Sequence, residues 1–565
     1  MKIVLGISAL IDHDSSAALL KDGIIVAAAA EERFTRIKHD SRFPSNAIAY
    51  CLNKSDIRIN EVTDISIGFD VSSGVTFPTS EYGKLFRQFS NPKKALEYFW
   101  YYSWWRGARR RAIDGVADLF VQQKELNPVE HHYCHATSAF MLSPFESSAI
   151  ITMDGTGERA TLTMGHGMGT KIERIASVDR PESLGLFYSE ITRYLGFNYF
   201  DEYKVMGLAA YGTLTLVGLF KKIIHFGNNG GFQLDRSYFK YYADVIVGLS
   251  ERFFREYGMP RKPGEEINQQ HKDIAFAMQR ILEEAVCHSA NYIQGQTGET
   301  NLCLSGGVSL NGMAAGAILR RTQFKKIFID PSPDDSGTAV GSALYRYHMI
   351  KESPRLNKLP ANYWGPEYDD DYICSALERC KVKSRNCEDP ADKAARLVAG
   401  GAVVGWFQGR MEWGQRALGN RSILADPRRS DMRGIVNRCV KNREEFRPFA
   451  PSVTHEDAAK YFDMPQPDIP YMNIVVQALP STVKSLPAVV HVDGTARVHT
   501  VRKDHNPLFW KLLRAMEKYT GHPVVLNTSF NISNEPIVCS PEDAIRCFYG
   551  SGLDNLFLGN HLIAK

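Results

Sequence analysis

The pattern of hydrophobic and polar positions at the start of the chain returns later in the sequence. The apolar run of residues 3–8 is followed by a polar turn, DHDSS, and by two strand-like runs that lead into charged residues typical of a helix. Residues 147–177 repeat this order, with a turn rich in Asp, Gly and Thr after the first run. Short apolar runs bounded by turn residues are typical of buried strands. The pattern therefore predicts a duplicated α/β core.

A shift in composition near residue 350 divides the chain. The stretch SPRLNKLPANYWGPEYDDD contains three prolines, a glycine and an acidic run, which are typical of a linker. We therefore predict a first domain at 1–352, a linker at 353–366 and a second domain at 367–565. The last 200 residues have strand and turn signals of their own, so the second domain is also expected to be α/β. Duplicated halves like those of the first domain are typical of the actin/hexokinase-type architecture.

The overall charge of the chain excludes several classes of partner. Its 565 residues include 67 Lys and Arg and 63 Asp and Glu, a net charge of +4. This gives no global field for nucleic acid or an anionic membrane. The sequence contains no apolar run near the roughly 20 residues that cross a bilayer, and its ten cysteines include no CxxC pair. We expect a soluble cytoplasmic protein with reduced thiols, no nucleic-acid partner and no membrane.

The segment EHHYCHATSAF is a candidate metal-binding helix. It places His131 and His135 four residues apart, so that both imidazoles share one helix face, while His132 and His135 form a competing pair. Asp154 ends a predicted strand, and Asp335 lies in a turn after another. Two imidazoles and two carboxylates suit Fe(II), Mn(II) or Zn(II). The alternative is that the histidines only cap and pack the start of a helix.

The segment LCLSGGVSLNGMAAG is typical of a strand, a glycine turn and a helix. Gly306 and Gly307 would let backbone N–H groups at the helix start approach a phosphate or ribose closely. The segment lacks the Walker lysine and the full dinucleotide fingerprint, so a plain tight turn is the alternative.

The positive charge of the chain is concentrated between residues 401 and 450. This stretch has ten Lys and Arg against five Asp and Glu. Guanidinium groups set among small residues can reach a multiply charged phosphate, which they bind with bidentate geometry. We therefore predict a site for a nucleotide or an RNA backbone. Its candidate residues are Arg416, Arg421, Lys441, Arg443, Arg447 and Arg497, with the neutral polar side chains Asn527, Ser529 and Asn531.

Residues 97–111 interleave aromatic side chains with arginines. Such a segment can stack on bases or on a flat organic substrate. The alternative, which we favour, is an amphipathic helix that packs on the core or on a second subunit, so a homodimer is plausible.

Eleven motifs, in order along nearly the whole chain, resemble those of the ATP-dependent O-carbamoyltransferases of the nodulation-protein-U and cephalosporin carbamoyltransferase family. They are HDSSAALLKDG, EERFTRIKHDSRFP, EHHYCHATSAF, MDGTGE, SLGLFYSEITRYLGF, YKVMGLAAYG, SGGVSLN, RALGNRSILADPR, FRPFAPSV, DGTARV and LNTSFN. The resemblance implies an N-terminal domain like the threonylcarbamoyl-tRNA transferases, with the actin/hexokinase-type (ASKHA) fold. It also implies a C-terminal α/β domain like the YrdC carbamoyl-adenylate synthases.

The resemblance also implies roles for individual residues. Positions that match the family's iron ligands are His131, His135, Asp154 and Asp335. His13 and Lys38 match polar positions of the transfer site. The pocket for carbamoyl phosphate and for ATP with Mg²⁺ is matched by Arg416, Lys441, Arg447, Arg497 and Ser529. Two departures affect the nucleotide contacts near 311–315 and 499: His499 stands where many members have Gln, and GGVSLNGMAAG differs from the commoner GGVALNCVANG.

The implied activity has two steps. Carbamoyl phosphate and ATP form carbamoyl adenylate, and the carbamoyl group then passes to a hydroxyl of a small natural product such as an antibiotic or a toxin. His13 is a candidate general base, because a neutral imidazole can take the hydroxyl proton; alternatively it only holds the DHDSS turn. Two rival interpretations are a threonylcarbamoyl-type tRNA-modifying enzyme and a non-catalytic nucleotide or metal sensor.

Overall fold

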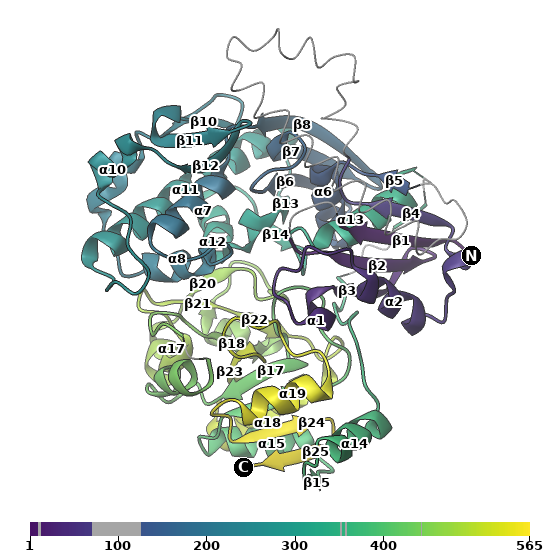
Figure 1. Ribbon diagram of the computed structural model, residues 1–565. Coiled ribbons are helices and arrows are strands. Elements are labelled where there is room, and N and C mark those ends of the chain that lie inside the picture. The colour runs from purple at the N-terminus through teal and green to yellow at the C-terminus, as the bar shows by residue number, and fades with distance from the viewer. Residues whose placement is uncertain (10–12, 71–125, 351–352, 356–358, 442) are drawn as a thin grey trace. The chain divides into compact units, whose positions relative to one another are not determined.

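The computed structural model describes residues 1–9, 13–70, 126–350, 353–355, 359–441 and 443–565. They form two compact units (Figure 1). The first unit comprises Met1–Glu31, His39–Leu310 and Ala317–Leu359, and the second comprises Glu32–Lys38, Asn311–Gly316 and Pro360–Lys565. The two short segments of the second unit both come from the range predicted for the first domain. The prediction for residues 97–111 lies outside the described residues.

The first unit begins with a five-stranded sheet. Its spatial order is β3 (Ile24–Ala30), β2 (Ser16–Lys21), β1 (Ile3–Ser8), β4 (Asp64–Ile67) and β5 (Leu126–Pro128). The first three strands are antiparallel, whereas β4 and β5 run parallel to β1. Every side chain of β1 is buried, as expected for a strand with helices on the sheet.

A second five-stranded sheet in the same unit repeats this plan. Its order is β8 (Lys171–Asp179), β7 (Ala160–Met168), β6 (Ser147–Met153), β13 (Asn301–Ser305) and β14 (Lys326–Ile329). Again three antiparallel strands are followed by two that run parallel to the first of them. The predicted duplication of a mixed α/β core is therefore confirmed.

Two helices lie between these sheets. Helix α13 (Gly337–Leu344) packs on strands β1, β2 and β4, whereas α6 (His131–Leu142) packs on β6 and β13, and the two helices also pack on each other. At Gly341 an added Cβ would lie 2.0 Å from the carbonyl oxygen of Cys134, so only glycine fits at this crossing. The middle of α13 therefore crosses the first turn of α6 at close range.

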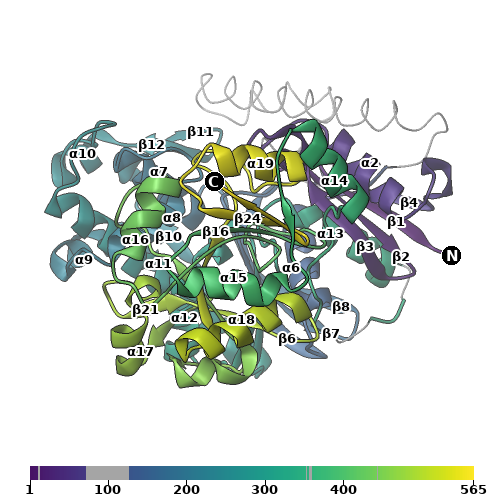
Figure 2. The ribbon, with the colours of Figure 1, turned by 90° about the horizontal axis from the view of Figure 1, so that it is seen from below.

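The second unit is built on an eight-stranded mixed sheet. In spatial order its strands are β15 (Arg385–Asn386), β25 (His561–Ala564), β24 (Asn555–Leu558), β16 (Val404–Phe407), β17 (Arg421–Ala425), β23 (Val524–Ser529), β18 (Ala450–Thr454) and β22 (His499–Val501). Helices α15 (Pro390–Ala399) and α18 (Pro507–Thr520) pack side by side, as Figure 2 shows, and share a core with this sheet. The predicted α/β character of this region is confirmed.

Smaller elements complete the second unit. A three-stranded sheet has the order β19 (Phe462–Asp463), β20 (Val475–Ala478) and β21 (Thr495–Arg497). The segment NEPIVCSPEDA, in the region expected to contain strands and turns, forms no strand: it is a loop that ends in helix α19 (Pro541–Tyr549), with a proline in the first turn of the helix.

Within the described part of the chain, no single helix is both long and apolar enough to cross a membrane. The bent pair Glu202–Ala209 and Leu214–Phe220 reaches that length and composition only when its two members are taken together.

Candidate functional site

Helix α6 brings two imidazoles to one buried place in the first unit. The helix begins at His131, after Glu130, whose carboxylate accepts a hydrogen bond from the N–H of Tyr133 and caps the helix. His131 and His135 are fully buried, and their Nε2 atoms lie 3.1 Å apart. Both histidines are on the helix that the sequence predicts.

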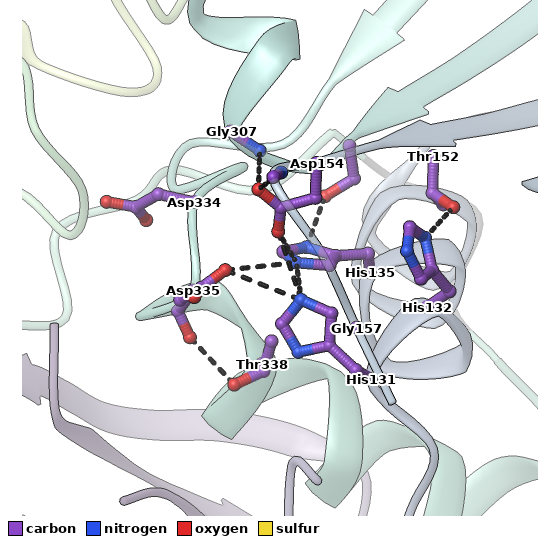
Figure 3. Close-up of polar contacts among 12 residues, drawn as sticks. His131, His132, His135, Thr152, Asp154, Gly157, Gly307, Asp334, Asp335 and Thr338 are labelled. Carbon is purple, nitrogen blue, oxygen red and sulfur yellow. Dashed lines mark hydrogen bonds and ion pairs between the residues drawn. The ribbon is translucent and has the colours of Figure 1, made fainter. Parts of the chain in front are cut away.

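Two carboxylates complete a cluster with these imidazoles. The Oδ2 atom of Asp154, which follows β6, lies 3.0 Å from Nε2 of His131 and 3.2 Å from Nε2 of His135. The Oδ1 atom of Asp335 lies 3.5 Å from each of the same nitrogens. Figure 3 shows the four side chains pointing toward one another. We call His131, His135, Asp154 and Asp335 the histidine–aspartate cluster.

The charges in this cluster compensate one another. Burial alone would lower the pKa of His135, but its hydrogen bonds and ion pairs with Asp154 and Asp335 raise it to about 10. Burial would raise the pKa of Asp154, yet the two imidazoles hold it well below the usual range. Without a cation, therefore, protons on the imidazoles balance the carboxylates.

Neighbouring groups hold the ligand atoms in place. The Nδ1 atom of His135 lies 3.2 Å from the Oγ of Ser305, which donates its own hydrogen to Asp330 at 2.8 Å. Ser305 therefore accepts from the Nδ1–H of His135 and leaves Nε2 facing the cluster. The other oxygen of Asp154 accepts from the backbone N–H of Gly307 at 3.3 Å.

The competing pair of His132 and His135 is not the one that the structure brings together. The ring of His132 lies 2.7 Å from the hydroxyl of Thr152 and 2.9 Å from the carbonyl oxygen of Ala160. Burial and the neighbouring imidazoles hold the pKa of His132 well below its ordinary value. His132 is thus a neutral packing residue, and it points away from the cluster in Figure 3.

The four donor atoms fit a divalent cation. All of them lie within 4.8 Å of one another, in a buried place. Two imidazole nitrogens and two carboxylate oxygens suit Fe(II), Mn(II) or Zn(II).

His13 lies beside the histidine–aspartate cluster. Its Nε2 atom is 3.5 Å from the second oxygen of Asp335, and its Nδ1 atom is 3.0 Å from Asp14. The same Asp14 carboxylate contacts Nδ1 of His39 at 2.8 Å, and the ring of Phe200 stacks on His39 with the centroids 4.1 Å apart. The sequence analysis identified His13 but not His39 or Phe200.

A second charged site lies in the second unit. Arg497, the last residue of β21, interacts with the guanidinium groups of Arg416, Arg443 and Arg447. Burial and these three like charges hold the pKa of Arg497 well below its usual value, and its buried Nε atom makes no hydrogen bond within the described structure. We call these four residues the arginine cluster. Such a group is stabilised when an anion binds.

The structure also locates several more of the predicted site residues. The hydroxyl of Ser529, at the end of β23, donates to the side-chain oxygen of Asn531 at 2.7 Å. The backbone of Lys441 ends a short helical turn, Val436–Lys441. Lys38 is exposed and belongs to the second unit, whereas His13 belongs to the first.

Arg421 corrects the expectation of a phosphate ligand at that position. Its side chain is completely buried at the start of β17. The guanidinium donates to the carbonyl oxygens of Gln408, Gly409 and Pro366, and it lies 3.6 Å from the centre of the Phe407 ring. Arg421 therefore holds the loop after β16 and is not available to a phosphate.

Gly306 and Gly307 form the predicted turn between β13 and the next helix. Gly306 has a φ of +86°, and an added Cβ would lie 2.1 Å from the carbonyl oxygen of Met153. The turn thus brings β13 against the end of β6, next to Asp154.

Two family models match the chain. The model described as "Carbamoyltransferase N-terminus" matches residues 3–344, and "Carbamoyltransferase C-terminus" matches residues 395–565. These ranges include the histidine–aspartate cluster and the arginine cluster respectively.

Individual relatives agree with the family models. The nodulation protein NolNO of Sinorhizobium fredii is 38% identical, over 98% of this chain and 79% of its own. The 3'-hydroxymethylcephem-O-carbamoyltransferase of Amycolatopsis lactamdurans is 35% identical, over 46% of this chain and 48% of its own. Among solved structures, HypF of T. kodakarensis is 15% identical over 64% of this chain and 49% of its own, with a TM-score of 0.32. The chain belongs to the carbamoyltransferase family and is a carbamoyltransferase, as its motifs predict.

Proposed function

We propose that this enzyme O-carbamoylates a small hydroxylated natural product in two steps, one in each unit. The observation that carries the proposal is that the chain has two charged sites of opposite kind: a cluster of imidazoles and carboxylates in the first unit and an arginine cluster in the second. The first suits a cation, and the second suits phosphate groups.

The first step belongs to the second unit. Carbamoyl phosphate and ATP with Mg²⁺ bind to six side chains of this unit: Arg416, Arg447, Arg497, Lys441, Ser529 and Asn531. Water hydrolyses carbamoyl phosphate to carbamate and inorganic phosphate. A carbamate oxygen then attacks the α-phosphorus of ATP, which releases pyrophosphate and leaves carbamoyl adenylate. The guanidinium groups hold the phosphates and balance the charge that develops on the leaving pyrophosphate.

The second step belongs to the first unit. The acceptor hydroxyl attacks the carbamoyl carbon, His13 takes the hydroxyl proton, and AMP leaves with the electron pair of the broken bond. Asp14 contacts one ring nitrogen of His13 at 3.0 Å and so fixes the ring. The resemblance also implies a polar role for Lys38 in transfer, which stays a prediction of the sequence because Lys38 belongs to the second unit. His131, His135, Asp154 and Asp335 would hold a divalent cation such as Fe²⁺, which when bound polarises the carbamoyl oxygen as a Lewis acid.

The proposed acceptor class rests on the relatives. The name of one relative specifies O-carbamoyl transfer to a hydroxymethyl cephem, and others are nodulation proteins. The weak net charge of +4 also favours a small acceptor over a tRNA. We expect the enzyme to act in the cytoplasm, because the nine cysteines whose side chains the structure describes have free thiols.

The two half-reactions can be separated by mutation. His135→Ala should still release pyrophosphate from ATP in the presence of carbamoyl phosphate but form no carbamoylated product. Arg416→Ala should lose pyrophosphate release, and chemically supplied carbamoyl adenylate should restore product formation to this variant only. Product is measured as the mass gain of one carbamoyl group on candidate hydroxylated natural products. If folded His135→Ala releases no pyrophosphate, both steps share one site and the proposal is wrong.

A further inference from the structure

A second set of metal-ligand side chains lies at one edge of the second unit. Helix α14 (Asp370–Arg379) carries Asp370 and Cys374 one turn apart, and β25 begins with His561. The Asp370 carboxylate lies 3.0 Å from Nε2 of His561, and the Cys374 sulfur lies 3.6 Å from the same nitrogen. The three ligand atoms all lie within 4.8 Å of one another. The set thus joins the first helix after the linker to the last strand of the chain.

The contacts converge on one nitrogen, which argues against a catalytic relay. In a nucleophile–histidine–acid triad the acid holds the ring nitrogen that faces away from the nucleophile. Here the carboxylate and the thiol both approach Nε2 of His561, whereas Nδ1 lies 3.4 Å from the hydroxyl of Ser384. A hydroxyl at Nδ1 can hold the proton there and leave the Nε2 lone pair for a cation.

The two distances to His561 are close to those between neighbouring ligands of a zinc ion. With Zn–N and Zn–O bonds of about 2.0–2.1 Å, Zn–S bonds of about 2.3 Å and a tetrahedral angle, neighbouring ligand atoms are about 3.3–3.6 Å apart. The two distances to His561, 3.0 and 3.6 Å, lie close to this range. Small side-chain rotations would therefore accommodate the ion.

Negative charge surrounds the thiol. Partial desolvation and the charges of Asp370, Asp371 and Glu378 raise the pKa of Cys374. Asp370 is exposed, and Cys374 and His561 are half-buried, so an ion can enter from solvent.

We propose that Asp370, Cys374 and His561 form a second metal site, which binds a thiolate-preferring divalent cation such as Zn²⁺ with water in the fourth position. This site differs in metal class from the histidine–aspartate cluster, because sulfur favours zinc over the hard cations. Binding displaces the thiol proton to solvent and cross-links α14 to β25. The bound cation stabilises the second unit. This proposal does not depend on the proposed carbamoyl transfer.

Cobalt provides a test that separates this site from the histidine–aspartate cluster. Metal-free full-length protein is titrated with Co²⁺ under anaerobic conditions. A thiolate-to-cobalt charge-transfer band in the near ultraviolet should appear and reach its maximum by two equivalents, because the histidine–aspartate cluster can bind the other Co²⁺ ion, and Zn²⁺ should abolish it. The histidine–aspartate cluster contains no sulfur and cannot give this band. Zn²⁺ should also slow alkylation of Cys374 at least tenfold, measured by mass spectrometry of its peptide.

Variants identify the ligands. Cys374→Ser and His561→Gln should lose the band, whereas Cys380→Ser, which removes the exposed cysteine at the end of the same helix, and His131→Ala should keep it. Asp370→Asn should weaken Co²⁺ binding at least tenfold. Circular dichroism verifies that each variant is folded. Absence of a band in the parent protein, or a band that persists in Cys374→Ser, would overturn the proposal.

Discussion

The histidine–aspartate cluster is a buried group of charges and the arginine cluster a half-buried one, and the charges are compensated differently in each. In the first, imidazoles and carboxylates neutralise one another, and the pKa of His135 rises to about 10. In the second, like charges lower the pKa of Arg497, and the nearby His499 on β22 is kept neutral by burial, which lowers its pKa to about 3. The first site is therefore stable without a ligand and exchanges protons for a cation, whereas the second is stabilised by a bound anion.

Removing one carboxylate should disrupt the balance of the first site. In metal-free protein, Asp154→Asn removes one of the two carboxylates that balance the charge of the buried imidazoles. The free energy of unfolding of the first unit should therefore fall by about 3 kcal/mol. Urea unfolding at neutral pH measures this loss. Asp179→Asn is the control, because Asp179 forms an ion pair with the exposed Arg159 and should cost under about 1 kcal/mol. Equal stability of Asp154→Asn and the parent would contradict the pairing.

Removing one guanidinium from the arginine cluster should raise stability, whereas removing a carboxylate from the histidine–aspartate cluster should lower it. Arg497→Met should lower pyrophosphate release about 10²–10³-fold, yet raise the free energy of unfolding, because one of four neighbouring like charges has gone. Steady-state assays and urea unfolding measure the two effects. Arg438→Gln, which removes an exposed arginine paired with Glu445, should change neither. A variant that loses both activity and stability would show that the guanidinium is structural.

The two sites should limit stability at opposite ends of the pH range. The pKa of His135 is raised from 6.5 to about 10, so its contribution to stability is complete below pH 6.5 and is lost as the pH rises through 10. The pKa of His499 is lowered to about 3, so its contribution is complete above pH 6.5 and is lost as the pH falls, by about 2 kcal/mol at pH 5. His499→Gln should flatten only the acid side of a curve of unfolding free energy against pH. An unchanged acid side would refute the assignment.

The smallest effect is expected from the group that orients His135. Ser305→Ala should weaken binding of Fe²⁺ about tenfold, because the imidazole loses the hydroxyl that fixes its tautomer. Anaerobic metal titration measures this affinity. Ser148→Ala is the matched control, since this buried serine contacts Cys303 and should leave metal affinity unchanged. Equal affinities of the two variants would mean that Ser305 plays no part in holding the ring.

The sequence predicted the parts of the fold that depend on local periodicity. The duplicated strand order and the helix carrying His131 and His135 follow from spacing within short segments. Contacts between distant segments were not predictable in this way. His39 and Phe200 meet His13 only because three separate stretches fold together.

Arg421 was misjudged for a related reason. A run of arginines and glycines in the sequence does not distinguish a guanidinium that faces a pocket from one enclosed by carbonyl oxygens. The loop formed by residues 408–409 supplies those oxygens, and it passes Arg421 only in the folded chain.

The close crossing at Gly341 affects how the ligands are spaced. Asp335 precedes α13, and His131 and His135 lie on α6, so the main-chain contact of Gly341 with Cys134 sets the distance across the cluster. Main-chain dimensions do not vary between relatives as side-chain volumes do. Exchanges of apolar residues around the cluster should therefore leave the ligand spacing unchanged. A single methyl group at position 341 would separate the ligands at once.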